Sequence, residues 1–172
     1  SGPSDPWVQR GQTLTNSNFD HVSLSADGSV LAYGDNAHAS GFGVVRVFQY
    51  DPNAPSNSQW GKIGQDMTVP SGSTGRQSYG EHVALSADGK RVASSTRKNF
   101  LGEDLGEDFV RVHEFNGIRG WTQLGTDIKR EHSRIGRHSL ALSEDGNSIV
   151  LGEAIWDAKD GKFGVGRAIV LQ

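Results

Sequence analysis

The chain has 172 residues, which fits one domain, and it contains no cysteine, so neither a disulfide framework nor thiolate chemistry is expected. A formal net charge of −3 argues against the basic stripe that attracts nucleic acid or an anionic membrane, and no apolar run approaches the roughly eighteen residues of a membrane span. The 23 glycines and a hydrophobic share of 34% favour many short strands joined by turns.

The expected domain boundaries follow from the start of the chain. Residues 1–6 are small and polar and are expected to be disordered or left over from cloning, whereas residues 7–172 are expected to form a single repeat domain. A signal peptide removed upstream would leave a similar start, so extracellular and cytosolic locations both remain open.

Three sequence markers recur along residues 7–172 with a period of about 60 residues. The first is a Trp followed four residues later by Gly, the second is Leu-Ser-x-Asp-Gly, and the third is an apolar run around an Arg. They begin at Trp7, Trp60 and Trp121, at Leu24, Leu85 and Leu142, and at Val45, Val110 and Gly166. Self-similarity of this kind is typical of a repeat architecture.

Each Leu-Ser-x-Asp-Gly marker predicts a strand, a tight turn and a second strand. The Asp of such a turn bonds its own backbone, and the Gly takes the positive φ that the turn needs. We therefore interpret these residues as structural, and we expect the repeated Trp side chains to pack at sheet edges. The structural set is Asp27, Gly28, Asp88, Gly89, Asp145, Gly146, Trp7, Trp60 and Trp121.

Each repeat is predicted to hold four strands, because Val, Ile, Phe, Tyr and Trp fill the runs while Gly, Pro, Asn and Asp fill the gaps. The first strands are residues 22–25, 83–86 and 140–143, and the second strands are 30–34, 91–95 and 148–152. The third strands are 44–50, 109–115 and 165–171, and the fourth strands are 60–67, 121–128 and, at the start of the chain, 7–14.

Residues 85–93, Leu-Ser-Ala-Asp-Gly-Lys-Arg-Val-Ala, resemble the core of TolB-type and WD-type repeats, and the Trp-x-x-x-Gly and Val-Arg-Val runs resemble FG-GAP-like propeller repeats. Four-stranded antiparallel units at a regular period are typical of a β-propeller. The resemblance implies an all-β propeller with three blades per chain that acts as a binding scaffold. The chain departs from these families because it repeats neither the Trp-Asp marker nor a regular calcium loop.

The third repeat ends after three strands, and its missing outer strand is the one at residues 7–14. Propeller rings have four to eight blades, so three blades do not close by themselves. We expect residues 7–14 to complete the last blade of a second molecule, which gives a six-bladed homodimer with twofold symmetry. The alternative is an excerpt of a longer propeller, natural or designed.

The long, dissimilar connections all fall at one end of such a meander, and variable loops on a rigid scaffold are where binding residues concentrate. They are residues 35–42, 68–81, 96–108, 129–137 and 153–163. Their carboxylates are weak candidates for Ca²⁺, which takes oxygen ligands, and solvated acids without a role are the favoured interpretation because no regular ligand spacing is present. The calcium candidates are Asp35, Glu103, Asp104, Asp157 and Asp160.

Two further features are candidates for ligand binding. His21, His82 and His138 lie at or beside the start of the first strands, near a central channel. A ring of histidines around the channel could take a metal or an anion. Histidines satisfied by water and backbone are the commoner alternative. Trp156 stands alone in a loop without a repeat partner, where it could serve as a platform for a sugar or a peptide.

Catalysis has little support in the sequence. There is no Gly-x-Ser-x-Gly elbow, no His-Glu-x-x-His and no phosphate-binding loop, and no cofactor is expected. The sequence predicts a non-catalytic scaffold for a protein or carbohydrate ligand. The alternatives are a propeller hydrolase of the glycosidase or lactonase type, using acids such as Glu103 or Asp157, and a structural module without a ligand.

Overall fold

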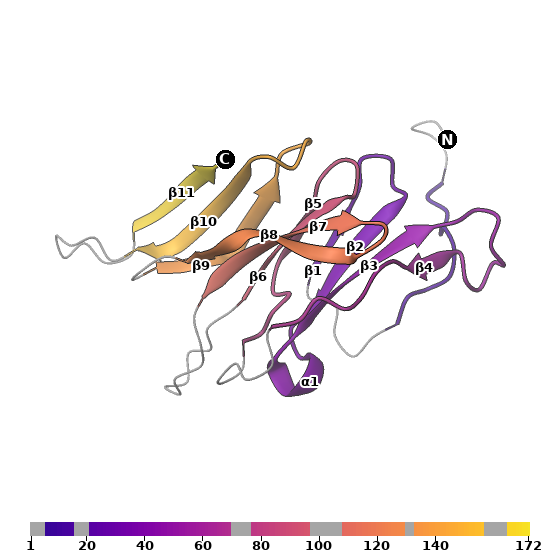
Figure 1. Ribbon diagram of the computed structural model, residues 1–172, viewed down its shortest axis with the longest axis horizontal. Helices are drawn as coiled ribbons and strands as arrows, with labels where there is room; N and C mark the ends of the chain where they lie inside the picture. Colours follow the sequence, from indigo (N-terminus) through magenta and orange to yellow (C-terminus); the bar gives the residue numbers. More distant parts are fainter. Residues whose placement is uncertain (1–5, 16–20, 70–76, 97–107, 130–132, 157–164) are drawn as a thin grey trace.

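The computed structural model describes residues 6–15, 21–69, 77–96, 108–129, 133–156 and 165–172, and these fold into three antiparallel sheets. Each sheet is a meander in which strands adjacent in sequence are adjacent in space. The three sheets lie next to one another, with the second between the first and the third (Figure 1). The chain is therefore all-β, as the sequence predicts.

Most strand bounds follow the predicted ones closely, but the first strand of the third sheet begins at Ser133 rather than at residue 140, and its second strand ends at Trp156 rather than at residue 152. The first sheet contains β1 (His21–Leu24), β2 (Val30–Asp35), β3 (Val44–Tyr50) and β4 (Trp60–Lys62), and one turn of helix, α1 (His38–Gly41), joins β2 to β3. The second sheet contains β5 (Val83–Leu85), β6 (Arg91–Ser95), β7 (Phe109–Asn116) and β8 (Gly120–Lys129). The third contains β9 (Ser133–Leu142), β10 (Ile149–Trp156) and β11 (Val165–Leu171).

The Leu-Ser-x-Asp-Gly markers form the predicted turns, and a hydroxyl joins the aspartate to the ladder. In the second sheet, Ser86 Oγ donates to Asp88 Oδ1 at 2.7 Å and accepts from the backbone N–H of Arg91 at 3.0 Å. Gly89 has a φ of 68°, which only glycine adopts readily. Matching bonds join Ser25 to Asp27 and Val30, and Ser143 to Asp145 and Ser148.

Two clusters of buried apolar side chains hold the sheets together. One cluster lies between the first and second sheets and includes Val30, Val47, Val92 and Trp121. The other lies between the second and third sheets and includes Ala93, Val110, Ile149 and Leu151. Each inward face is a stripe of alternate residues, as expected for strands whose successive side chains point to opposite sides.

Backbone bonds between the hairpins tie the sheets together at one end. The N–H of Ala26 donates to the carbonyl of Ala87 at 3.0 Å, and the N–H of Ala87 donates to the carbonyl of Glu144 at the same distance. The contact between the first and second sheets is thus repeated between the second and the third.

The predicted alignment of the third Arg marker is wrong. The sequence pattern aligns Arg167 with Arg46 and Arg111, but pairing places Ile169 at that position: Arg46 is opposite Tyr33, Arg111 is opposite Ser94, and Ile169 is opposite Leu151. The slip is two residues, which keeps the same face of the strand, so alternation alone does not detect it.

The predicted fourth strands differ most from expectation. β4 ends at Lys62 rather than at residue 67, shortly before Gly64 with its φ of 71°, and Met67 rejoins the ladder through a bridge to Val45. Residues 6–15 belong to none of the sheets, and Trp7 is fully exposed. Trp121 is buried and Trp60 is half-buried.

Candidate functional surfaces

The end of the molecule that carries the long loops is built on two segments bonded to each other, residues 35–43 and 77–82, which we call the platform. The N–H of Ser78 donates to the carbonyl of Gly41 at 2.9 Å, and the N–H of Tyr79 donates to the carbonyl of Phe42 at 3.1 Å. A parallel bridge joins Gly43 to Tyr79. The connection between β2 and β3 is therefore fixed to the chain that enters β5 (Figure 1).

The platform, with the end of β2 that enters it, is tightly packed at three glycines, Gly34, Gly43 and Gly80. A Cβ on Gly34 would lie 1.9 Å from the carbonyl oxygen of Gly80, and one on Gly80 would lie 2.7 Å from the carbonyl oxygen of Val44. Ala39, Ser40 and Ser78 adopt positive φ values of 51°, 63° and 46°. Non-glycine residues hold that conformation only when their surroundings impose it.

Asp35, the described member of the calcium candidates, is fully buried within the platform. One carboxylate oxygen accepts from the N–H of Ala37 at 3.2 Å, and the other lies 4.0 Å from His38 Nδ1. Next to it, Asn36 donates to a carboxylate oxygen of Glu81 at 2.6 Å. The other four candidates, Glu103, Asp104, Asp157 and Asp160, lie outside the described residues. Within the described part of the chain, no three metal-ligating side chains gather around one point.

The structure brings two of the three candidate histidines together. The rings of His21 and His82 lie with their centroids 3.9 Å apart at 37°, across the contact between the first and second sheets. His21 is exposed and His82 is 8% exposed. His21 and His82 lie four residues before the serine of their Ser-x-Asp-Gly turns, and in β9 this position is occupied by Ser139, not by His138. The side chain of His138 is outside the described part.

Trp156 is the last residue of β10, where its backbone is paired with Val165 on one side and Ser133 on the other. The prediction that Trp156 lies in a loop is wrong, because the ladders of β10 with β9 and β11 continue to this residue. Its side chain is not among those described.

A buried polar group that the sequence does not reveal lies behind the platform. The hydroxyl of Ser94 donates to Tyr79 Oη, which lies 3.5 Å from His113 Nδ1. Burial raises the pKa of Tyr79 to about 12. Burial, with the positive charge of Arg111 nearby, lowers the pKa of His113 to about 4, so this histidine is neutral at neutral pH. Hydrophobic alternation carries no signal for these residues, because they replace apolar residues on an inward face.

Paired charges complete this group. Arg111 binds Asp127 through two bonds, from Nε at 2.7 Å and Nη2 at 2.8 Å, and its guanidinium lies over the ring of Phe109. In the first sheet, Arg46 Nε and Nη2 both contact one carboxylate oxygen of Asp66, at 2.8 and 2.7 Å. Both pairs orient their side chains, and so they brace the first and second sheets.

The three repeated aspartates are turn formers in the structure. Hydrogen bonds from the backbone of Ser29 and from the Ser25 hydroxyl lower the pKa of Asp27 to about 2, and bonds from Ser143 and Asn147 lower that of Asp145 to about 2. The turn also lowers the pKa of Asp88. Their carboxylates are engaged in holding the hairpins.

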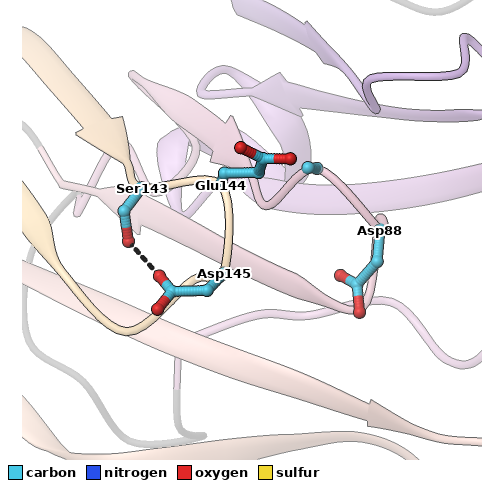
Figure 2. A pocket seen from close by; sticks show the side chains of 5 residues that line it. Asp88, Ser143, Glu144 and Asp145 are labelled. Atoms are coloured by element: carbon cyan, nitrogen blue, oxygen red, sulfur yellow. Dashed lines mark hydrogen bonds between the residues drawn. The ribbon is translucent and has the colours of Figure 1, made fainter.

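An open hollow of about 540 Å³ lies at the hairpin end, between the second and third sheets (Figure 2). Ala87, Asp88, Ser143, Glu144 and Asp145 line it. Asp145 is turned toward Ser143 in its own turn, and Asp88 belongs to the neighbouring turn, so the carboxylates do not converge (Figure 2). The hollow is the seam between two hairpins.

In comparisons with known proteins, no family model and no curated protein matches the chain. Among the described residues, no helix has the length and apolar character to span a membrane.

Proposed function

We propose that the chain is a non-catalytic binding scaffold of the β-propeller type, whose platform end presents loops to a protein or carbohydrate ligand. The observation that carries the proposal is the rigid platform: two loop segments far apart in sequence are bonded backbone to backbone and packed glycine on glycine. A pre-organised base of this kind lets variable loops bind without a large ordering cost.

The propeller assignment is supported by the arrangement of the sheets. Each is a meander, and the same hairpin bond and apolar contact join the first to the second and the second to the third. Two chains with three sheets each would supply the six blades of a ring, within the four to eight that propellers have. Light scattering should then give twice the chain mass of 18.5 kDa, and a single-chain mass at every concentration would contradict the ring.

Binding is tested with glycan and peptide arrays and platform variants. Asn36→Ala removes a half-buried platform side chain, and Phe42→Ala removes an exposed one. The matched control is Glu144→Gln, which changes an exposed residue at the hairpin end. We expect the two platform variants to lose at least tenfold in affinity for any ligand that the arrays reveal, and the control to keep it. Equal affinities in all three would place binding elsewhere.

The rival function is hydrolysis with unrepeated acids of the loop end. A panel of ester and glycoside substrates separates the two, because a scaffold turns over none of them. Turnover that is abolished by Glu103→Gln or Asp157→Asn would contradict the scaffold. The described acids with a lowered pKa support the scaffold, since they serve turns and ion pairs: Asp27, Asp66, Asp88, Asp127 and Asp145.

A further inference from the structure

We propose that residues 7–14 of one chain add to the third sheet of a second copy of this chain as its fourth strand, with Trp7 docked over Leu124 and Gly125 of that copy. The inference rests on the ring proposed above and names the contact through which the ring would close. It follows from five observations on the two sides of the contact.

The receiving edge is the first observation. Among the described residues the third sheet runs in the order β11-β10-β9, which makes β11 an edge strand. In the other two sheets the corresponding strands, β3 and β7, are covered by β4 and β8. An open edge presents a row of backbone donors and acceptors that pair readily with another strand.

The second observation is that residues 7–14 already have the local shape of such a fourth strand. The glycine four residues after each Trp has nearly the same φ: 72° at Gly11, 71° at Gly64 and 69° at Gly125. The side chains two and six residues after each Trp also contact each other in every copy. The bonds are Gln9 to Thr13 at 3.1 Å, Lys62 to Asp66 at 2.6 Å and Gln123 to Asp127 at 3.0 Å.

The third observation is a matched pair of residues across the two surfaces. In the first and second sheets an arginine of the third strand pairs with the aspartate six residues after the repeated Trp, Arg46 with Asp66 and Arg111 with Asp127. The corresponding residues are Ile169 in β11 and Thr13 in the N-terminal segment. Both members of the ion pair are replaced by uncharged residues, so pairing these strands would leave no buried charge without a partner.

The fourth observation is the Trp contact. The indole of Trp60 donates to the carbonyl of Arg10 at 2.8 Å and lies under Gly11, and the indole of Trp121 donates to the carbonyl of Ile63 at 3.0 Å and lies under Gly64. In the third copy, a Cβ built on Gly125 meets no atom within 4 Å. Trp7, the one repeated Trp without such a cover among the described residues, is fully exposed.

The fifth observation is that the outer faces of the first and third sheets carry exposed apolar residues. Val83 and Leu85 of β5 are buried against the first sheet, and the residues that correspond to them in β1, Val22 and Leu24, are 60% and 54% exposed. On the third sheet Val150 and Val170 are exposed as well. Each end of the stack thus shows one half of a contact that the chain makes twice internally, and a second copy supplies both missing halves.

Cysteine cross-linking tests the register, because the chain contains no cysteine of its own. Residues 13 and 169 would face each other as Arg46 faces Asp66, beside the hydrogen-bonded pair Val45 and Met67, so their Cα atoms would be about 4.5 Å apart, within disulfide range. A Thr13→Cys chain mixed with a differently tagged Ile169→Cys chain should form a disulfide-linked heterodimer. Neither chain alone should cross-link.

A matched pair of truncations tests the anchor. Trp7→Ala and Ile118→Ala each remove a fully exposed apolar side chain, and the Ile118 control lies in the turn between β7 and β8. We expect Trp7→Ala to weaken self-association at least tenfold and Ile118→Ala to leave it unchanged. Thr13→Asp should also weaken it, and Thr13→Asp with Ile169→Arg should restore it by recreating the pair of the other sheets.

The outcomes separate this inference from the ring. A twofold mass that persists in Trp7→Ala, without a cross-link between residues 13 and 169, would overturn strand addition and leave the ring standing. A single-chain mass at all concentrations would overturn both. A cross-link with loss of association in Trp7→Ala supports both.

Discussion

At the scale of single residues, the hydroxyl of the Leu-Ser-x-Asp-Gly turn joins the turn to the sheet. Ser86 is 1% exposed, and it both donates to Asp88 and accepts from the N–H of Arg91. Ser86→Ala leaves that N–H without a partner, so the free energy of unfolding should fall by about 1–2 kcal/mol. Urea unfolding measures the change, and Ser58→Ala in an exposed loop is the control. Equal losses in both variants would show that the turn serine has no special role.

The buried histidine predicts a dependence of stability on pH. The pKa of His113 is about 4 in the folded chain and about 6.5 when unfolded. Between these values the unfolded chain binds a proton that the folded chain excludes, so stability falls as the pH falls. The expected loss from pH 7 to pH 5 is about 2 kcal/mol.

His113→Gln should remove that part of the pH dependence, whereas His38→Gln, which changes a partly exposed histidine, should keep it. Denaturant titrations of the three proteins at both pH values measure the difference. Parallel pH profiles for wild type and His113→Gln would contradict the burial of a neutral histidine at this position.

At the scale of elements, the Asp-Gly hairpins join neighbouring sheets as well as neighbouring strands. Gly28 and Gly89 both have a φ of 68°, but a Cβ on Gly89 would lie 2.7 Å from Val30 Cβ, while one on Gly28 would have its nearest atom at 3.5 Å. Gly28→Ala should cost about 1 kcal/mol for its backbone. Gly89→Ala should cost about 1–3 kcal/mol more, because it crowds the contact between sheets.

Thermal or urea unfolding of the two glycine variants separates backbone strain from packing between the sheets. Each variant serves as the control for the other, since their φ values agree. If both lost the same stability, the second hairpin would not be packed against the first sheet as tightly as the structure shows.

Most strands could be predicted from the sequence because the turn-forming residues and the alternation of apolar side chains indicate the same bounds. β3 begins at Val44 after Gly43 and ends at Tyr50 before Asp51, as predicted. The platform could not be predicted, because its bonds join residues near 42 to residues near 79, and alternation carries no information about such contacts. The alignment of Arg167 failed for a related reason: a slip of two residues preserves the face of a strand.

At the scale of the whole molecule, the proposed assembly makes stability depend on concentration. A partner that binds only the folded chain stabilises it by mass action, so the midpoint of thermal unfolding should rise with protein concentration. Trp7→Ala should shift this rise to at least tenfold higher concentrations, and Ile118→Ala should leave it where it is. Scanning calorimetry over a hundredfold range of concentration checks this, and a midpoint that is constant in the wild type would contradict self-association.

The shape of residues 7–14 without a partner strand has a kinetic consequence. Ordinary strand exchange is slow because a strand must first leave its own sheet. Here the segment belongs to no described sheet, its Gly11 turn is already formed, and Arg10 and Gln12 already hold Trp60 of the same chain. Association would then be a single bimolecular docking step, with a rate proportional to the concentration of each chain and without the steep temperature dependence of an unfolding reaction.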